Sequence, residues 1–193
     1  MQATKILKHE HDVIRRALAI LDRIGARAGR NEAPPAADVE GVLDFLSTFA
    51  DGCHHVKEET ILFPALEAAG LPHGQGPVAA MLDQHDQGRR LVAALRREQT
   101  ALDEDAGARA RFAAAARDYV ALLEQHIAIE NEVLFPSADA MLSGERDREI
   151  AAAFDRHEEV EMGADAHRRF HRMLDEMGAR YLAAPAPAPA PAA

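Results

Sequence analysis

The chain has 193 residues, of which 28% are charged, and carries a formal net charge of −10 at pH 7. This length predicts about one domain with a sizeable core, and the acidic balance argues against nucleic acid or an anionic membrane surface as a partner. There is no apolar run near the ~20 residues of a membrane-spanning helix and no signal-peptide pattern. The single cysteine, Cys53, fits a reducing cytoplasm, so we expect a cytoplasmic protein.

The composition predicts an all-α protein, because Ala, Leu, Glu and Arg are plentiful and Val and Ile form no alternating runs. The first helix is expected over residues 3–28, where apolar residues recur at spacings of three and four. His11 occupies the step of this apolar stripe between Leu7 and Ile14. It is therefore expected on the buried face of the helix.

The second helix is expected over residues 38–69, ahead of a glycine that suits the helix C-terminus. Counting in threes and fours along its apolar residues places His54 and Glu58 on the inward face. The same count places His55 and Glu59 toward the edge of the helix. A phase error of one residue exchanges the two pairs, so the second pair remains the alternative.

The third and fourth helices are expected over residues 78–101 and 108–142. In the third helix, His85 lies on the apolar stripe, and Gly88 indicates a close approach or a need for space. The inward stripe of the fourth helix reads Phe112, Tyr119, Leu122, His126, Glu130 and Val133. Four long helices joined by short loops predict an up-down-up-down four-helix bundle.

A fifth amphipathic segment, residues 146–182, is expected to form an additional C-terminal helix outside the bundle. We therefore divide the chain into a bundle, residues 1–142, and a helical extension packed on it, residues 143–184. Residues 185–193 alternate Ala and Pro and predict a disordered tail.

One motif occurs twice. Residues 54–64 and residues 126–136 each read His-x-x-x-Glu, three further residues and then Leu-Phe-Pro. Because residues four apart lie on one face of a helix, each copy presents an imidazole beside a carboxylate. With one histidine each from the first and third helices, the polar groups on the inward stripes are His11, His54, Glu58, His85, His126 and Glu130.

Four imidazoles and two carboxylates are costly to bury without partners, and a bound metal explains their convergence. Six ligands are many for one ion, whereas two ions bridged by Glu58 and Glu130 share them sensibly. Imidazole and carboxylate ligands suit iron, manganese or zinc. Open coordination positions favour non-haem iron over structural zinc, which prefers closed four-ligand sites.

The doubled motif resembles the hemerythrin-like, or HHE cation-binding, family. The matching pieces cover about residues 3–142 and are Glu10-His11-Asp12, residues 54–64, Gln84-His85-Asp86 and residues 126–136. The resemblance implies a hemerythrin-like bundle that holds two non-haem iron ions joined by an oxo or hydroxo bridge, with manganese or zinc as alternatives. The ligands that it implies are His11, His54, Glu58, His85, His126 and Glu130.

The chain departs from the oxygen-carrying hemerythrins at two positions. Those proteins carry a second histidine one turn along the third helix, where this chain has Arg89. Their fourth-helix carboxylate is an aspartate at a wider spacing from the histidine, whereas Glu130 here follows His126 by four residues. It is more similar to bacterial two-glutamate members, which are associated with iron-centre repair and with nitric oxide or peroxide handling. One histidine fewer implies a more open site and argues against reversible oxygen carriage.

The expected function is that of a di-iron protein that binds or reacts with a small oxidant, namely dioxygen, peroxide or nitric oxide. One alternative is a peroxide-decomposing, catalase-like enzyme. Another is an iron- or redox-sensing or iron-storage module that acts through a partner. The expected partner is thus a small diatomic or peroxide ligand, and the expected assembly is a monomer or a homodimer.

Some other groups have an ordinary interpretation beside a functional one. Cys53 adjoins His54, but an ordinary thiol is expected. Tyr119 is expected to pack in the core rather than to donate a hydrogen bond to a bound oxygen species. A charged helix face explains His157, His167 and His171 more simply than a further metal site.

Overall fold

The computed structural model describes residues 1–183, with Ala164 described by its backbone alone, and the expected tail at residues 185–193 lies outside this part. All regular structure in the described chain is helical. The elements in chain order are α1 (Gln2–Gly29), α2 (Ala36–Phe45), η1 (Leu46–His55), η2 (Glu58–Leu62), α3 (Phe63–Ala68), α4 (Gly76–Gln99), α5 (Ala106–Ile129), η3 (Glu130–Leu134), α6 (Phe135–Met141), α7 (Gly144–Glu161) and α8 (Gly163–Tyr181).

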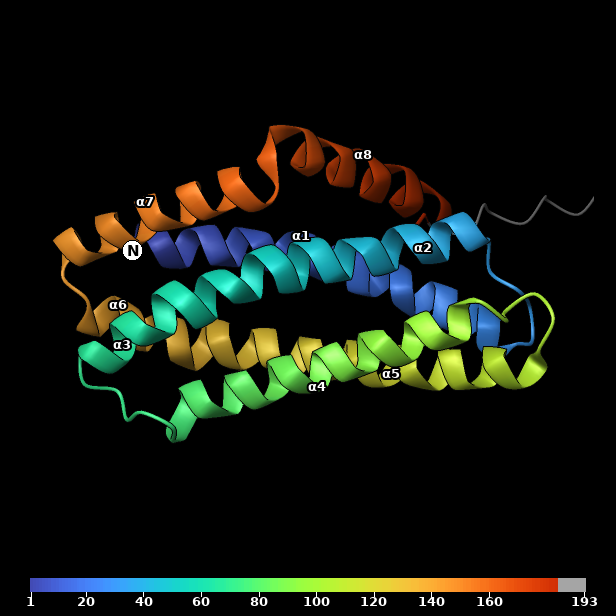
Figure 1. Ribbon diagram of the computed structural model, residues 1–193, viewed down its shortest axis with the longest axis horizontal. Coiled ribbons are helices and arrows are strands. Elements are labelled where there is room, and N and C mark those ends of the chain that lie inside the picture. Colours follow the sequence, from blue (N-terminus) through green and yellow to red (C-terminus); the bar gives the residue numbers. More distant parts are fainter. Residues whose placement is uncertain (184–193) are drawn as a thin grey trace, which may run out of the picture.

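Four helical rods form the body of the molecule (Figure 1). The first rod is α1, the second runs from α2 to α3, the third is α4, and the fourth runs from α5 to α6. Successive rods are joined by short loops at alternate ends, and α5 packs on both α1 and α4. The predicted all-α, up-down-up-down bundle is therefore confirmed.

The C-terminal part forms two helices, so the expectation of a single additional helix is wrong. Gly163, at the junction of α7 and α8, adopts a φ of +63°, a backbone conformation that glycine adopts without strain. The helix α7 packs on α1, η1 and η2, and α8 packs on α1 and α2 (Figure 1). The boundary at residue 142 stays a prediction.

The second and fourth rods contain π-helical stretches, namely η1, η2 and η3. A π-helix has more residues per turn than an α-helix, so each step rotates the side chain by a smaller angle and the phase shifts. Val133 shows the consequence, because it was expected inside but is 51% exposed, while Leu134 is buried. Short π-helical segments occur frequently at functional sites.

The apolar core consists of two clusters. Along α1, Leu7 belongs to one cluster and Ile14 to the other, and the buried His11 lies between them. Buried histidines and glutamates separate the same two clusters along the second and fourth rods. The bundle thus holds one buried polar layer across its core.

Among the described residues, no helix has both the length and the apolar character needed to cross a membrane.

Candidate metal centre

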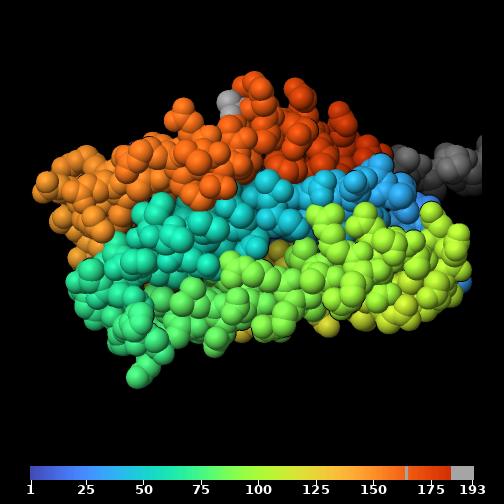
Figure 2. Space-filling view, viewed as in Figure 1, coloured from blue at the N-terminus to red at the C-terminus, as the bar shows by residue number. Residues whose placement is uncertain are grey.

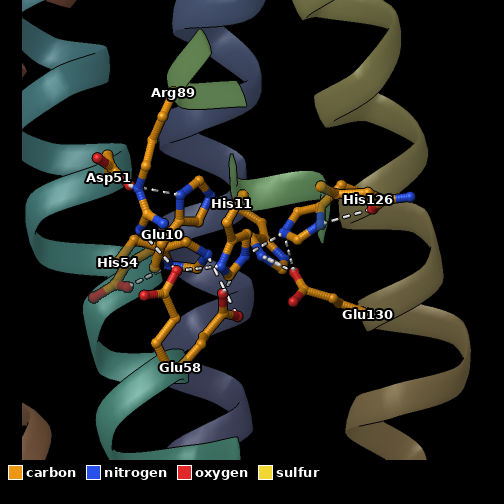
Figure 3. A network of polar contacts seen from close by, with 12 residues as sticks. Glu10, His11, Asp51, His54, Glu58, Arg89, His126 and Glu130 are labelled. Atoms are coloured by element: carbon orange, nitrogen blue, oxygen red, sulfur yellow. Dashed lines mark hydrogen bonds and ion pairs between the residues drawn. The ribbon is translucent and has the colours of Figure 1, made fainter. Parts of the chain in front are cut away.

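All six residues that the sequence predicts as metal ligands meet in this polar layer. Figure 3 labels five of them, namely His11, His54, Glu58, His126 and Glu130. The six residues make up two of the three groups of potential ligands in the described chain, and within each group the candidate ligand atoms all lie within 4.8 Å of one another. The first group is His11, His54, Glu58 and Glu130. The second group is Glu58, His85, His126 and Glu130. Their action as ligands stays a prediction, but the folding of the chain brings them together.

The four histidines form two pairs with matching geometry. The ring centroids of His11 and His54 lie 4.7 Å apart with an interplanar angle of 64°. Those of His85 and His126 lie 4.8 Å apart at 62°. Because the lone pair of an imidazole nitrogen lies in the ring plane, rings tilted in this way can direct two lone pairs at one cation.

Each glutamate lies between the two histidine pairs. The Oε1 atom of Glu58 is 3.6 Å from His54 Nε2, and its Oε2 atom is 3.5 Å from His85 Nε2. The Oε2 atom of Glu130 is 3.2 Å from His11 Nε2 and also 3.2 Å from His126 Nε2. Each carboxylate thus contacts one histidine of each pair, as a bridge between two cations would.

The outer nitrogen of each ligand histidine faces an oxygen acceptor. The Nδ1–oxygen pairs are His11–Asn131 (3.1 Å), His54–Glu10 (2.8 Å), His85–Glu59 (2.7 Å) and His126–Gln84 (3.0 Å). When Nδ1–H donates to these oxygens, the lone pair is on Nε2 and points into the centre, as metal-binding histidines require.

These acceptors follow the repeat, a signal that the sequence interpretation missed. Glu59 and Asn131 directly follow the two motif glutamates. Glu59 accepts a hydrogen bond from His85 of α4, and Asn131 accepts one from His11 of α1. Glu10 directly precedes His11, and Gln84 directly precedes His85. Glu10 accepts a hydrogen bond from the motif histidine His54, and Gln84 accepts one from His126. Each of the four rods therefore supplies a candidate ligand and, next to it in sequence, a residue that orients a candidate ligand of another rod.

The inner atoms of the site have no hydrogen-bond partners. His85 Nε2 lies 3.2 Å from His126 Nε2, and two lone pairs at that distance repel each other unless a cation lies between them. The unpaired buried atoms in this region also include His11 Nε2, His54 Nε2, His55 Nε2 and both carboxylate oxygens of Glu58 and Glu130. Each such atom costs about 1–3 kcal/mol in the folded state. Cations bound here remove these costs, so the residues fit a metal site.

Burial also keeps two of the candidate ligand histidines, His54 and His85, in the neutral form that binds metal. It lowers the pKa of His54 to about 4, although the hydrogen bond to Glu10 acts in the opposite direction. Burial likewise lowers the pKa of His85. Both imidazoles are therefore neutral at pH 7, with a lone pair available.

The two glutamates have opposite electrostatic situations. Burial raises the pKa of Glu58, and the neighbouring charge of Glu130 raises it further. Burial acts on Glu130 in the same direction, but His126 and His11 outweigh it and hold the pKa of Glu130 below its ordinary value. Without cations, two charged carboxylates in this space repel each other.

A buried lysine supports one side of the centre. Lys57 is fully buried, and its Nζ donates to Glu10 Oε1 at 2.5 Å and to Glu158 Oε2 at 3.0 Å. Burial alone would raise the pKa of Glu10, but His54 and Lys57 outweigh it and lower this pKa to about 2. The chain Glu158–Lys57–Glu10–His54 thus links α7 to the metal centre.

Arg89 occupies the position where the oxygen carriers have their second α4 histidine, and it has a different role here. Its guanidinium donates to Glu59 Oε1 at 2.7 Å and to Asp51 Oδ1 at 2.8 Å. Glu59 is the acceptor of His85 Nδ1. Arg89 therefore fixes a carboxylate that orients the candidate ligand His85. Glu59, with its side chain 22% exposed, lies at the edge as expected.

His55 was expected at the edge, and this expectation is wrong, because the residue is only 3% exposed. The π-helical turn of η1 brings the consecutive residues His54 and His55 both inward. The His55 ring stacks on His85 at 4.0 Å with an interplanar angle of 15°. His55 also forms a third group of potential ligands with His85 and His126, whose candidate ligand atoms all lie within 4.8 Å of one another, so His55 is an alternative ligand on that side of the centre.

Other candidate groups lie apart from the centre. Cys53 is buried, and burial raises its thiol pKa to about 11, which fits the expected ordinary thiol. His167 and His171 lie near each other on α8, with ring centroids 4.5 Å apart. Within residues 1–183, no group of three or more potential ligands includes these two histidines.

Comparison with known proteins gives two sets of relatives. The chain is 29% identical over 169 residues to the uncharacterized protein Rv1995 of Mycobacterium tuberculosis, a match covering 87% of this chain and 62% of that protein. It is 28% identical over 145 residues to the iron-sulfur cluster repair protein YtfE of Enterobacter sp., covering 72% of this chain and 64% of that protein. The YtfE of Escherichia coli O1:K1 is 27% identical over the same length. No solved structure matches significantly.

The chain spans less than two thirds of the length of these curated relatives. A family comparison matches residues 2–138 to the hemerythrin HHE cation-binding domain, and this range includes all six residues of the two groups. The sequence repeat, the helical bundle and the buried histidine and glutamate layer agree with that match. The chain belongs to the hemerythrin HHE cation-binding domain family, whose domain binds metal cations.

Proposed function

We propose that the protein binds two non-haem iron ions in this centre and uses them to bind or react with a small oxidant, namely dioxygen, a peroxide or nitric oxide. The observation that carries the proposal is the pair of four-residue groups that share Glu58 and Glu130. Six protein ligands for two cations leave coordination positions open to a small molecule. Bound iron supplies Lewis acidity and electrons there.

The donor set supports iron as the resident metal. Structural zinc prefers closed sites of four ligands, whereas neutral imidazoles with bridging carboxylates in a bundle core are typical of di-iron proteins. The YtfE relatives are named iron-sulfur cluster repair proteins, which supports iron chemistry in this family. A reducing, cytoplasmic location, which suits the single cysteine, is part of the proposal.

We expect the purified chain to take up two iron ions under anaerobic conditions, because each group supplies two histidines and shares both glutamates. Elemental analysis and equilibrium dialysis measure the stoichiometry. Adding hydrogen peroxide should then convert the bound ferrous iron to ferric iron, measured with a ferrous chelator after acid quenching. A chain that takes up less than one iron, or whose ferrous iron does not respond to any of the three oxidants, would refute the proposal. Oxygen released from the peroxide would identify the catalase-like alternative.

A sensing function is the second candidate, and the contact between Lys57 and Glu158 favours it. Metal binding that fixes His54 also fixes Glu10 and Lys57, and through Lys57 the helix α7. We expect amide hydrogen exchange in residues 144–161 to slow when iron binds. The Lys57→Met variant should lose this difference. Equal exchange in α7 with and without iron would exclude this form of signalling.

A further inference from the structure

A pocket of about 480 Å³ opens between the second rod and α4, next to the metal centre. Figure 2 shows a hollow there, between the cyan surface of α2 and η1 and the green surface of α4. Pockets of ~300–1,000 Å³ are typical for organic ligands. Dioxygen and hydrogen peroxide need little more than the ~30 Å³ of a water molecule. The pocket is therefore far larger than the oxidants named above require.

The exposed wall area of the pocket is mainly apolar, with Leu46 and Val92 contributing to it. Four charged residues also line the pocket, namely Asp51, Arg89, Arg96 and Arg97. Gly88 faces the Tyr119 ring, and a Cβ atom at this position would lie 3.6 Å from Tyr119 Cε2. The absence of a side chain at residue 88 keeps space open in front of the tyrosine. Ala93 lines the exposed mouth of the pocket.

One buried polar atom at the pocket, His55 Nε2, has no hydrogen-bond partner among residues 1–183, and the buried Tyr119 lines the same pocket. His55 Nε2 is buried and unpaired, while its Nδ1 faces Asp51 Oδ1 at 3.4 Å. With the proton on Nδ1, Nε2 is an acceptor. Tyr119 is 2% exposed and lines the pocket, and burial raises its pKa, so its hydroxyl remains a donor.

The internal repeat indicates that the histidine is not needed for folding. Aligning His54 with His126 places His55 opposite Ile127, which packs in the apolar core. The bundle therefore accepts an apolar residue at the matching position of the fourth rod. A buried histidine with an unpaired nitrogen costs stability, and at this pair of matching positions the histidine is on the rod that lines the pocket.

We propose that this pocket binds organic hydroperoxides, R–O–OH, with an apolar R group along Leu46 and Val92 and the hydroperoxyl group between Tyr119 and His55. The Tyr119 hydroxyl donates to a hydroperoxide oxygen, and the hydroperoxide O–H donates to His55 Nε2. Hydrogen peroxide makes the same hydrogen bonds but leaves the apolar walls exposed to water. Organic hydroperoxides therefore bind more tightly.

This inference rests on the proposed function for its reaction. The O–O bond of the hydroperoxide breaks and accepts two electrons, which come from two ferrous ions that become ferric. One oxygen leaves as the alcohol R–OH and the other as water, with two protons taken from solvent.

The test compares two exposed alanines of α4. Ala93→Trp fills the mouth of the pocket, whereas Ala80→Trp changes a position outside it. The first readout is the binding of the redox-inactive alcohol 2-phenylpropan-2-ol to the metal-free chain, measured by saturation-transfer NMR. The second is the ratio of the rates at which cumene hydroperoxide and hydrogen peroxide oxidise the ferrous form, measured by stopped flow.

We expect the unmodified chain and Ala80→Trp to bind the alcohol and to react at least about tenfold faster with cumene hydroperoxide, from burial of its phenyl group. Ala93→Trp should lose alcohol binding and lower the rate ratio about tenfold. Tyr119→Phe should weaken alcohol binding without changing iron stoichiometry. No alcohol binding, or equal effects of the two tryptophan variants, would overturn the inference. If the alcohol binds but neither peroxide oxidises the iron, the proposed function fails and the pocket assignment stands.

Discussion

Glu58→Gln and Glu130→Gln each reduce bound iron from two ions per chain to one or none, because each carboxylate belongs to both groups of candidate ligands. Only Glu58→Gln is expected to stabilise the metal-free protein as well. Burial and the charge of Glu130 disfavour the ionised form of Glu58, and the amide removes that charge. Glu130 is instead held ionised by His11 and His126, so its removal loses favourable contacts.

We estimate the gain for Glu58→Gln at about 1–2 kcal/mol, which raises Tm by roughly 2–8 °C in a domain of this size. Iron content by elemental analysis and thermal unfolding of the metal-free chains measure both effects. Glu132→Gln is the matched control, since Glu132 is exposed in the same π-helical turn. Full iron content in either ligand variant would contradict the assignment of bridging carboxylates. A metal-free Glu58→Gln chain less stable than wild type would contradict the electrostatic argument.

Lys57→Met should lower the free energy of unfolding of the metal-free protein by about 3–5 kcal/mol, the usual cost of removing one partner of a buried ion pair. The methionine fills similar space but leaves Glu10 buried without its cation. The double variant Lys57→Met/Glu10→Gln should recover most of this loss, because no unpaired charge remains. Iron should bind more weakly to both variants, since Glu10 orients His54 through Nδ1.

Urea unfolding of the two variants and of Glu10→Gln alone gives the coupling energy between the two side chains. Glu158→Gln is the control, and its effect should be smaller because the Glu158 side chain is 35% exposed. Additive losses in the double variant would show that Lys57 and Glu10 act independently. That result would also remove the structural basis for a link between α7 and the metal centre.

The sequence by itself determined the helical class, the bundle and the six residues that converge in its polar layer. The reason is that the α-helical period is fixed, so a histidine and a glutamate four residues apart share a face wherever the helix is regular. The repeat gave this information twice, and the single histidines of α1 and α4 follow from the apolar stripes that they interrupt.

Only the tertiary structure decided the phase of the π-helical turns, which depends on packing between rods and leaves no periodic pattern in the sequence. That phase brings His55 inward beside His54 and exposes Val133. The partners of Lys57 come from α1 and α7, so no local pattern predicted that this charged side chain would be fully buried. The pocket at Tyr119 likewise forms where η1, α4 and α5 meet, and its size follows from side chains distant in sequence.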